Sequence, residues 1–140
     1  APGQYELTIK DENNCEYTEP YIVREPPSVT LLPSPSVCVG ETTVVLPYSN
    51  PRVNPNSYSI IWNSTALAAG LVNVTDAALP SIVAPATSAN INIVVPANIT
   101  VNTYNGILKV KNTAGDSSGD IPFSISITPY PLKAHIQLVQ

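Results

Sequence analysis

The chain has 140 residues, of which 44% are hydrophobic and only 11% are charged, and this composition excludes a disordered chain and a coiled coil. Six basic against ten acidic residues give a net charge of −4, and the basic residues stand singly, so neither nucleic acid nor an anionic membrane surface is expected as a partner. Fifteen prolines beside six glycines predict an all-β chain of short strands, because proline ends helices and presets turn geometry.

Residues 1–27 are predicted to form one β-hairpin. Apolar residues alternate with polar ones from Tyr5 to Ile9, residues 11–14 supply turn chemistry, and residues 17–23 are extended again. This segment holds six acids and two bases, and Pro26-Pro27 ends it. A lone two-stranded hairpin is marginal in water. We therefore expect it to pack against the next domain or against a neighbouring molecule, in preference to disorder.

Residues 28–130 are predicted to form a complete antiparallel Ig-like β-sandwich. We expect strands over residues 29–32, 42–46, 58–62, 71–74, 89–95, 104–112 and 121–128, a loop over 49–56 and a helical turn over 66–69. In the last two strands apolar residues alternate strictly with Lys, Ser and Thr. Such alternation is typical of antiparallel sheets with one buried and one solvated face.

The two halves of the chain share an internal repeat. Residues 5–11 resemble Tyr104 followed, after a two-residue insertion, by residues 108–112. In this register Asn14-Cys15 lies opposite Gly115-Asp116. Residues 1–27 are thus predicted to be the F–G hairpin that ends a preceding Ig-like repeat.

Three aromatic residues are predicted to be structural. Each copy of the repeat has a turn-forming segment before its tyrosine, as expected for a tyrosine corner at the start of strand F, so Tyr5 and Tyr104 are assigned to this role. Trp62 falls where strand C of a sandwich places its core tryptophan. A tryptophan buried in any other β core fits the sequence equally well.

Residues 131–140 are predicted to be a linker and the first strand, residues 133–139, of a following unit. Because the sequence starts at Ala1 and shows neither a signal peptide nor an apolar run of about 20 residues, we interpret it as mature or excised material. Low charge and a Thr/Ser/Asn/Pro-rich surface favour an extracellular setting.

Two cysteines, Cys15 and Cys38, stand 23 positions apart without a zinc-site or thioredoxin-like spacing. A disulfide between them is one interpretation, and two thiols that have lost other partners is the second. A bridge requires Cα atoms within about 7 Å, which the sequence does not decide.

No catalytic set is predicted. The single histidine, His135, lies near the end of the chain without an evident partner for nucleophilic catalysis. The carboxylate pairs Asp11/Glu12 and Asp116/Asp120 lie in turns without aromatic walls that would bind a sugar ring. Both turns bunch oxygen ligands of the kind calcium takes, yet the same residues are those any hairpin turn prefers. No cofactor is expected, and calcium stays open as a weaker alternative.

Residues 1–27, APGQYELTIKDENNCEYTEPYIVREPP, resemble the end of the short extracellular repeats of SprB-type gliding-motility adhesins. The positions that fit the pattern are Gly3, Tyr5, Asp11, Asn13, Asn14, Cys15, Glu25 and Pro26, with Asn14 in place of the usual glycine. The following region resembles the PKD/Ig-like modules that accompany such repeats, through Val37-Cys38-Val39-Gly40-Glu41, the Trp62 strand, Ala68-Ala69-Gly70-Leu71 and residues 104–112.

The resemblance implies a non-enzymatic module of a tandem-repeat cell-surface adhesin. Such a protein is exported, in this family by type IX secretion, and carries the cell over a substratum in gliding. Its partners would be neighbouring repeats of the same chain and an extracellular substratum or polysaccharide. In these modules the cysteine after strand A often pairs with one in the F–G turn. Here Asp116 stands at the second position, which would leave Cys38 without a partner in its domain and pair Cys15 with a residue upstream.

A carbohydrate-binding or accessory module of a secreted polysaccharide-degrading enzyme is the alternative function. Sugar-binding faces use exposed, coplanar Trp or Tyr side chains. The chain has one tryptophan and seven tyrosines, so the number of exposed aromatics distinguishes the two functions.

Overall fold

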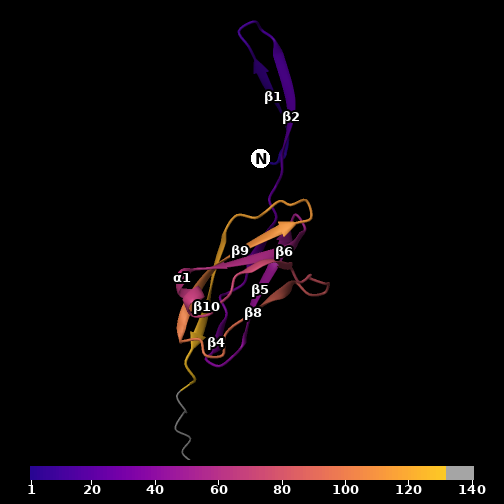
Figure 1. Cartoon of the computed structure of the whole chain (residues 1–140). Coiled ribbons are helices and arrows are strands. Elements are labelled where there is room, and N and C mark those ends of the chain that lie inside the picture. Colours follow the sequence, from indigo (N-terminus) through magenta and orange to yellow (C-terminus); the bar gives the residue numbers. More distant parts are fainter. Residues whose placement is uncertain (132–140) are drawn as a thin grey trace, which may run out of the picture.

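A computed structural model describes residues 1–131 as a β-hairpin followed by an all-β sandwich (Figure 1). The predicted third unit, residues 133–139 with His135, lies outside the described residues. The hairpin consists of β1 (Gly3–Lys10) and β2 (Glu16–Val23) and extends away from the sandwich. In the part of the chain that the structure describes, no helix is long and apolar enough to cross a membrane.

Two sheets form the sandwich. One has three strands in the order β3-β5-β8, and the other has five in the order β4-β10-β9-β6-β7. Their bounds are β3 (Ser28–Leu31), β4 (Ser36–Cys38), β5 (Thr43–Arg52), β6 (Pro55–Trp62), β7 (Val74–Ala78), β8 (Ser88–Val94), β9 (Asn102–Asn112) and β10 (Ile121–Thr128). All pairings are antiparallel except that of β4 with β10. The fold class predicted from the sequence is confirmed.

The core lies between the two sheets. Residues that alternate along β5, β6, β8, β9 and β10 are buried, among them Val44, Leu46, Ile60, Ile91, Leu108, Val110 and Ile125. Their outward neighbours are mostly Ser, Thr, Asn and Lys. This pattern is the one expected for two facing sheets with solvated outer surfaces.

Two sequence expectations for the sandwich were wrong in detail, and one strand was missed. The loop predicted over 49–56 is strand almost throughout, because Pro51 falls in a bulge of the β3–β5 pair, where no ladder hydrogen bond is needed. The strand predicted over 71–74 begins only at Val74, because the Trp62 indole N–H donates to the Val72 carbonyl and holds the preceding segment as a connector. The short parallel strand β4 was missed.

A short helix, α1 (Ser64–Ala68), replaces the helical turn expected over 66–69. The Asn63 side chain caps it by accepting a hydrogen bond from the Ala66 amide at 2.9 Å. Gly70 ends the segment at a φ of 98°, a left-handed conformation that favours glycine.

Tyr48 places a phenol inside the core. Its ring is buried, its hydroxyl donates to the Pro80 carbonyl, and burial raises the pKa of Tyr48 above its ordinary value. The neutral phenol is therefore favoured in the folded state. The unfolded chain releases this proton at a lower pH than the folded chain does.

We expect the sandwich to lose stability as the pH rises above about 10, the ordinary pKa of tyrosine. Below that pH the Tyr48 phenol is protonated in both the folded and the unfolded chain, and its contribution to the free energy of unfolding is fully present. Urea denaturation at pH values of about 8 to 11 measures the effect. Tyr48→Phe should make the decline less steep, and an unchanged slope in this variant would contradict the assignment.

The hairpin β1–β2 repeats the corner and turn hydrogen bonds of β9–β10, although Tyr5 stands six residues before its turn residue Asp11 and Tyr104 stands eight before Asn112. The Tyr5 hydroxyl donates to the carbonyl of Ala1, four residues back, at 2.7 Å, and the Tyr104 hydroxyl donates to that of Thr100 at 2.9 Å. The turns match as well: the amides of Asn14 and Cys15 donate to Asp11, at the carbonyl and the carboxylate. In the second copy Gly115 and Asp116 donate to the carbonyl and side chain of Asn112.

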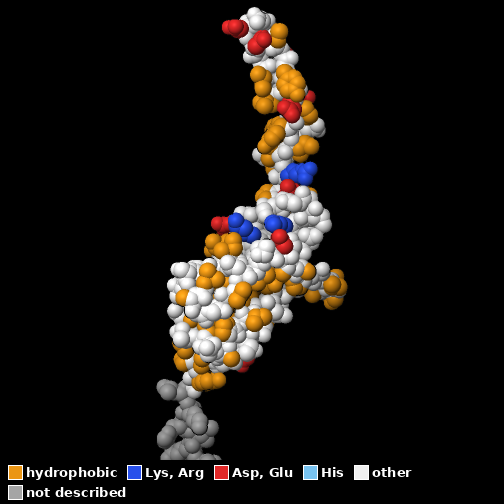
Figure 2. Space-filling model, in the orientation of Figure 1, with side chains coloured by type: hydrophobic (Ala, Val, Ile, Leu, Met, Phe, Trp, Pro, Cys, Tyr) orange, Lys and Arg blue, Asp and Glu red, His pale blue; other side chains and the backbone are white. Residues whose placement is uncertain are grey.

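The two copies differ in what covers them. Leu7 is 57% exposed and Ile9 is 59% exposed, whereas their counterparts Leu108 and Val110 are fully buried. Every residue of β1 and β2 is exposed, so the expected packing of the hairpin against the sandwich was wrong, and the other expected arrangement, packing against a neighbouring molecule, stays a prediction. Figure 2 shows its apolar side chains open to solvent.

The linker between the hairpin and the sandwich is held at three points. Pro27 is fully buried. Arg24 lies 3.8 Å from the Asp116 carboxylate, and Glu25 lies 3.0 Å from the Arg52 guanidinium. The hairpin is thus joined at the end of the sandwich that carries the turn between β9 and β10.

Candidate functional site

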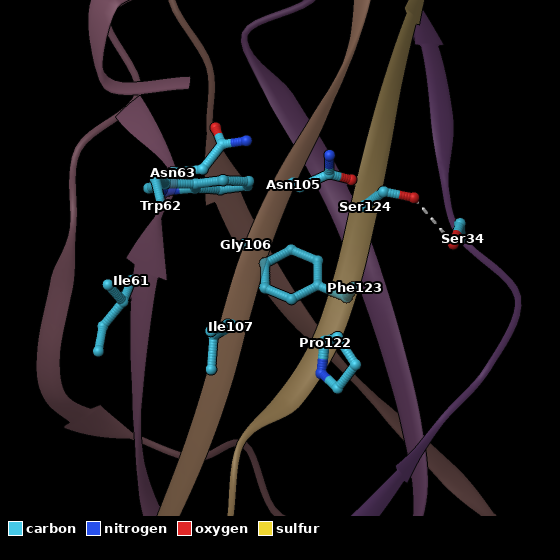
Figure 3. Close-up of a pocket in the computed structure, with 10 residues that line it drawn as sticks. All are labelled: Ser34, Ile61, Trp62, Asn63, Asn105, Gly106, Ile107, Pro122, Phe123 and Ser124. Carbon is cyan, nitrogen blue, oxygen red and sulfur yellow. Dashed lines mark hydrogen bonds between the residues drawn. The ribbon is translucent and has the colours of Figure 1, made fainter. Parts of the chain in front are cut away.

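A shallow depression of about 510 Å³ lies over three neighbouring strands of the five-stranded sheet (Figure 3). It is lined by residues of β6, β9 and β10 and of the segments next to them, namely Ser34, Ile61, Trp62, Asn63, Asn105, Gly106, Ile107, Pro122, Phe123 and Ser124. Ile61 and Pro122 are exposed, and Ile107 is half-buried. An apolar surface open to solvent therefore occupies a face that is otherwise polar.

The polar groups of the depression lie along one side of this apolar surface. Asn63, Asn105, Ser124 and Ser34 lie beyond the apolar side chains, as Figure 3 shows. The Ser124 hydroxyl donates to that of Ser34 at 3.4 Å. Amides and hydroxyls of this kind both donate and accept hydrogen bonds, so the depression can take a neutral polar ligand or a polymer surface.

Gly106 keeps the sheet thin at the centre of the depression. A Cβ atom at this residue would lie 2.9 Å from the rings of both Phe123 and Trp62. These two rings pack edge to face with centroids 5.2 Å apart. Trp62 is buried, with its indole N–H donating to the Val72 carbonyl at 3.1 Å. The Trp62 ring is therefore part of the core and offers no exposed platform to a sugar.

No titratable side chain lines the depression among the residues that the structure describes. General acid–base or nucleophilic chemistry needs such a group within hydrogen-bond reach of the reacting atom. Among its described lining residues the depression therefore has no side chain that could transfer a proton.

The carboxylates singled out from the sequence hold turns and strands together. The Asp11 carboxylate accepts hydrogen bonds from the amides of Asn13 and Cys15 at 2.9 and 2.8 Å. Asp116 contacts Arg24, and Asp120 lies 3.1 Å from the Lys109 ammonium. Within residues 1–131 no group of three or more His, Cys, Asp or Glu side chains gathers as metal ligands.

The structure does not contain the disulfide that the sequence left open. Cys15 and Cys38 are both free, with Cys15 in the exposed turn of the hairpin and Cys38 at the end of β4. Cys38 pairs with Thr128 at the end of β10, whereas Asp116 precedes the start of that strand. Positions 38 and 116 thus lie at opposite ends of β10, so the pairing of these two positions that the resemblance to the adhesin modules implies does not fit the structure.

The depression itself was not predicted from the sequence. Its apolar members, Ile61, Ile107 and Pro122, come from three strands that only the sheet order brings together. One signal was present: Ile61 and Ile107 stand at outward positions of strands whose other outward residues are polar. These two residues pair directly in the β6–β9 register.

No model of a known protein family matches the chain, and no curated protein resembles it closely enough to count as a relative.

Proposed function

We propose that this chain is a non-enzymatic module of a large tandem-repeat adhesin on the cell surface, where it acts as spacer and contact surface in attachment and gliding. The protein would be secreted by a type IX system. Its partners would be neighbouring repeats of the same polypeptide and an extracellular substratum or polysaccharide. The observation that carries the proposal is the duplication of one hairpin with a tyrosine corner and the same turn, once before the sandwich as β1–β2 and once within it as β9–β10.

Duplicated modules in one chain are the signature of repeat architectures. The path of the chain agrees with a head-to-tail array, because the polypeptide enters the sandwich at one end and leaves β10 at the other (Figure 1). Pro26-Pro27 and the two ion pairs at the linker restrict how the hairpin swings relative to the sandwich. A restricted linker suits a spacer that must keep its direction.

The contact surface in this proposal is the depression over β6, β9 and β10. Exposed apolar side chains beside amide and hydroxyl groups suit weak adhesion to a hydrated polymer. Many copies in an array would together bind the polymer more tightly than one copy does. Figure 2 shows most of the visible charged side chains on the hairpin and on the adjoining end of the sandwich. Within residues 1–131 no charged side chain lines the depression, so it can approach surfaces of either sign.

The carbohydrate-binding alternative is less well supported. Trp62 is buried, and the exposed tyrosines of the hairpin lie on the face whose counterpart in the sandwich forms the core. In the described part of the sandwich, residues 28–131, Tyr130 is the one exposed aromatic side chain, and a single ring does not make the platform that sugar-binding modules use.

Attachment of coated beads under flow tests the proposal. Beads carrying the full chain should be retained on a polysaccharide-coated surface several-fold longer than beads carrying an unrelated protein. Ile61→Asp, at the depression, should remove most of this retention. Val94→Asp is the control, because it adds the same charge at an exposed apolar residue of the other sheet, where Val94 is 79% exposed. This variant should keep the retention. Equal loss in both variants, or no retention by the parent chain, would contradict the proposal.

A further inference from the structure

We infer that the apolar face of β1–β2 binds an incomplete β-sandwich, one that lacks its own last two strands and completes its core with this hairpin. The inference rests on the tandem arrangement proposed above and specifies the partner of its first segment. The apolar face is called the hairpin face below. It consists of Tyr5, Leu7 and Ile9 from β1 with their cross-strand partners Tyr21, Glu19 and Tyr17 from β2.

The hairpin face is apolar like a surface that faces a protein core, but it is exposed to solvent. Tyr5, Leu7 and Tyr21 border a hollow of about 270 Å³ on it. The opposite face is more polar, with Thr8 bonded to Thr18 and Lys10 lying 3.0 Å from Glu16. Exposed apolar patches rimmed by polar groups mark interaction sites on soluble proteins. Leaving this face in water forfeits about 25 cal/mol for each Å² that a partner would bury.

The second copy of the hairpin shows what kind of partner fits the first. In the sandwich, β6 pairs antiparallel with β9, β4 pairs parallel with β10, and the sheet β3-β5-β8 covers the apolar face. The partner of β1–β2 must therefore offer an antiparallel strand edge to β1, a parallel edge to β2 and a second sheet across the core. A β-sandwich without strands F and G offers all three.

The register also specifies one side chain of the partner. Because Leu7 corresponds to Leu108, Tyr5 takes the position of Gly106, and Tyr21 takes that of Phe123. Gly106 has no space for even a Cβ atom next to Trp62. A sandwich that accepts Tyr5 must then have a small side chain where this sandwich has Trp62.

A second copy of the hairpin is a poorer occupant. Two hairpin faces packed together would enclose Glu19 of each chain in apolar surroundings, and an unpaired buried carboxylate is costly. The counterpart of Glu19 is Ile121, which pairs with Leu108 and is only half-buried. In a completed sandwich the Glu19 carboxylate would therefore reach water at the rim.

A fusion tests the inference with the full chain present. A copy of residues 28–101 is placed directly before Ala1, so that Tyr5 takes the place of Gly106 and Leu7 that of Leu108, and the copy carries Trp62→Ala to make room for Tyr5. Hydrogen exchange of residues 3–23 is measured in the fusion and in the 140-residue chain. We expect the hairpin amides to exchange on the order of 100-fold more slowly in the fusion, because there they exchange only when the completed module unfolds.

Matched variants show whether the hairpin face is responsible. In the fusion, Leu7→Lys should return the exchange of the hairpin to its rate in the 140-residue chain, whereas Thr8→Lys, on the opposite face, should keep the protection. Restoring Trp62 in the copy should weaken the protection at least tenfold. Equal exchange of the hairpin in the fusion and in the 140-residue chain, with β9–β10 still protected, would overturn the inference.

The remaining outcomes separate this inference from the proposed function. Protection of the hairpin that rises with concentration in the 140-residue chain would identify a second copy as the occupant and overturn the inference. Bead retention depends on the depression of the sandwich and not on the hairpin. Normal retention without protection in the fusion therefore contradicts the inference alone, and protection without retention contradicts the proposed function alone.

Discussion

Leu108→Ala is expected to lower the free energy of unfolding of the sandwich by about 2–5 kcal/mol. Leu108 is fully buried on β9 between two sheets, so the truncated side chain leaves a cavity that rigid strands on both sides cannot fill. Trp62 is the only tryptophan of the chain and lies in the sandwich, so its fluorescence during urea denaturation reports this unfolding alone.

The matched control is Leu7→Ala, the same position in the first copy of the hairpin. Because the Leu7 side chain is mostly exposed and lies on a hairpin that does not pack against the sandwich, its removal should change the unfolding free energy of the sandwich by no more than about 0.5 kcal/mol. A comparable loss in both variants would mean that the hairpin packs against the sandwich in solution.

Trp62→Ala should lower the free energy of unfolding of the sandwich by about 3–5 kcal/mol. The ring packs edge to face against Phe123 and fills the space above Gly106. Its loss also leaves the Val72 carbonyl without the indole N–H and frees the connector before β7. Thermal unfolding followed by far-UV circular dichroism measures the change, since the variant has no tryptophan to observe.

Ile61→Ala is the control for Trp62→Ala. Ile61 is the adjacent residue of β6, points to the outer face and is 45% exposed, so its truncation should cost about 0.5 kcal/mol or less. Two variants at neighbouring positions should thus differ by several kcal/mol. Similar costs would show that the tryptophan does not anchor the core.

Much of the sandwich could be predicted because its determinants are local. The period-two alternation of β9 and β10 identifies strands, their buried face and their antiparallel pairing without any knowledge of the partners. The bounds predicted for β10, residues 121–128, agree with the structure. The repeat was also visible in the sequence, because the tyrosine corner and the tight turn each depend on residues four positions apart.

Other features depended on residues distant in sequence. Three residues of β4 are too few to show a period, and their pairing with β10 joins positions about 90 residues apart. The Trp62 indole sets the start of β7. A bulge opposite β3 allows β5 to continue through Pro51. None of these partners can be identified from the local pattern.

The sequence by itself determined the all-β class, the hairpin with its corner tyrosine and the division of the chain at Pro26-Pro27, because these follow from side-chain alternation and turn chemistry within a few residues. Only the tertiary structure decided that the hairpin stands uncovered, that Cys15 and Cys38 stay apart and that Ile61, Ile107 and Pro122 share one depression. Those outcomes depend on sheet order and register. A strand's own sequence selects which of its faces is buried, but not which neighbour buries it.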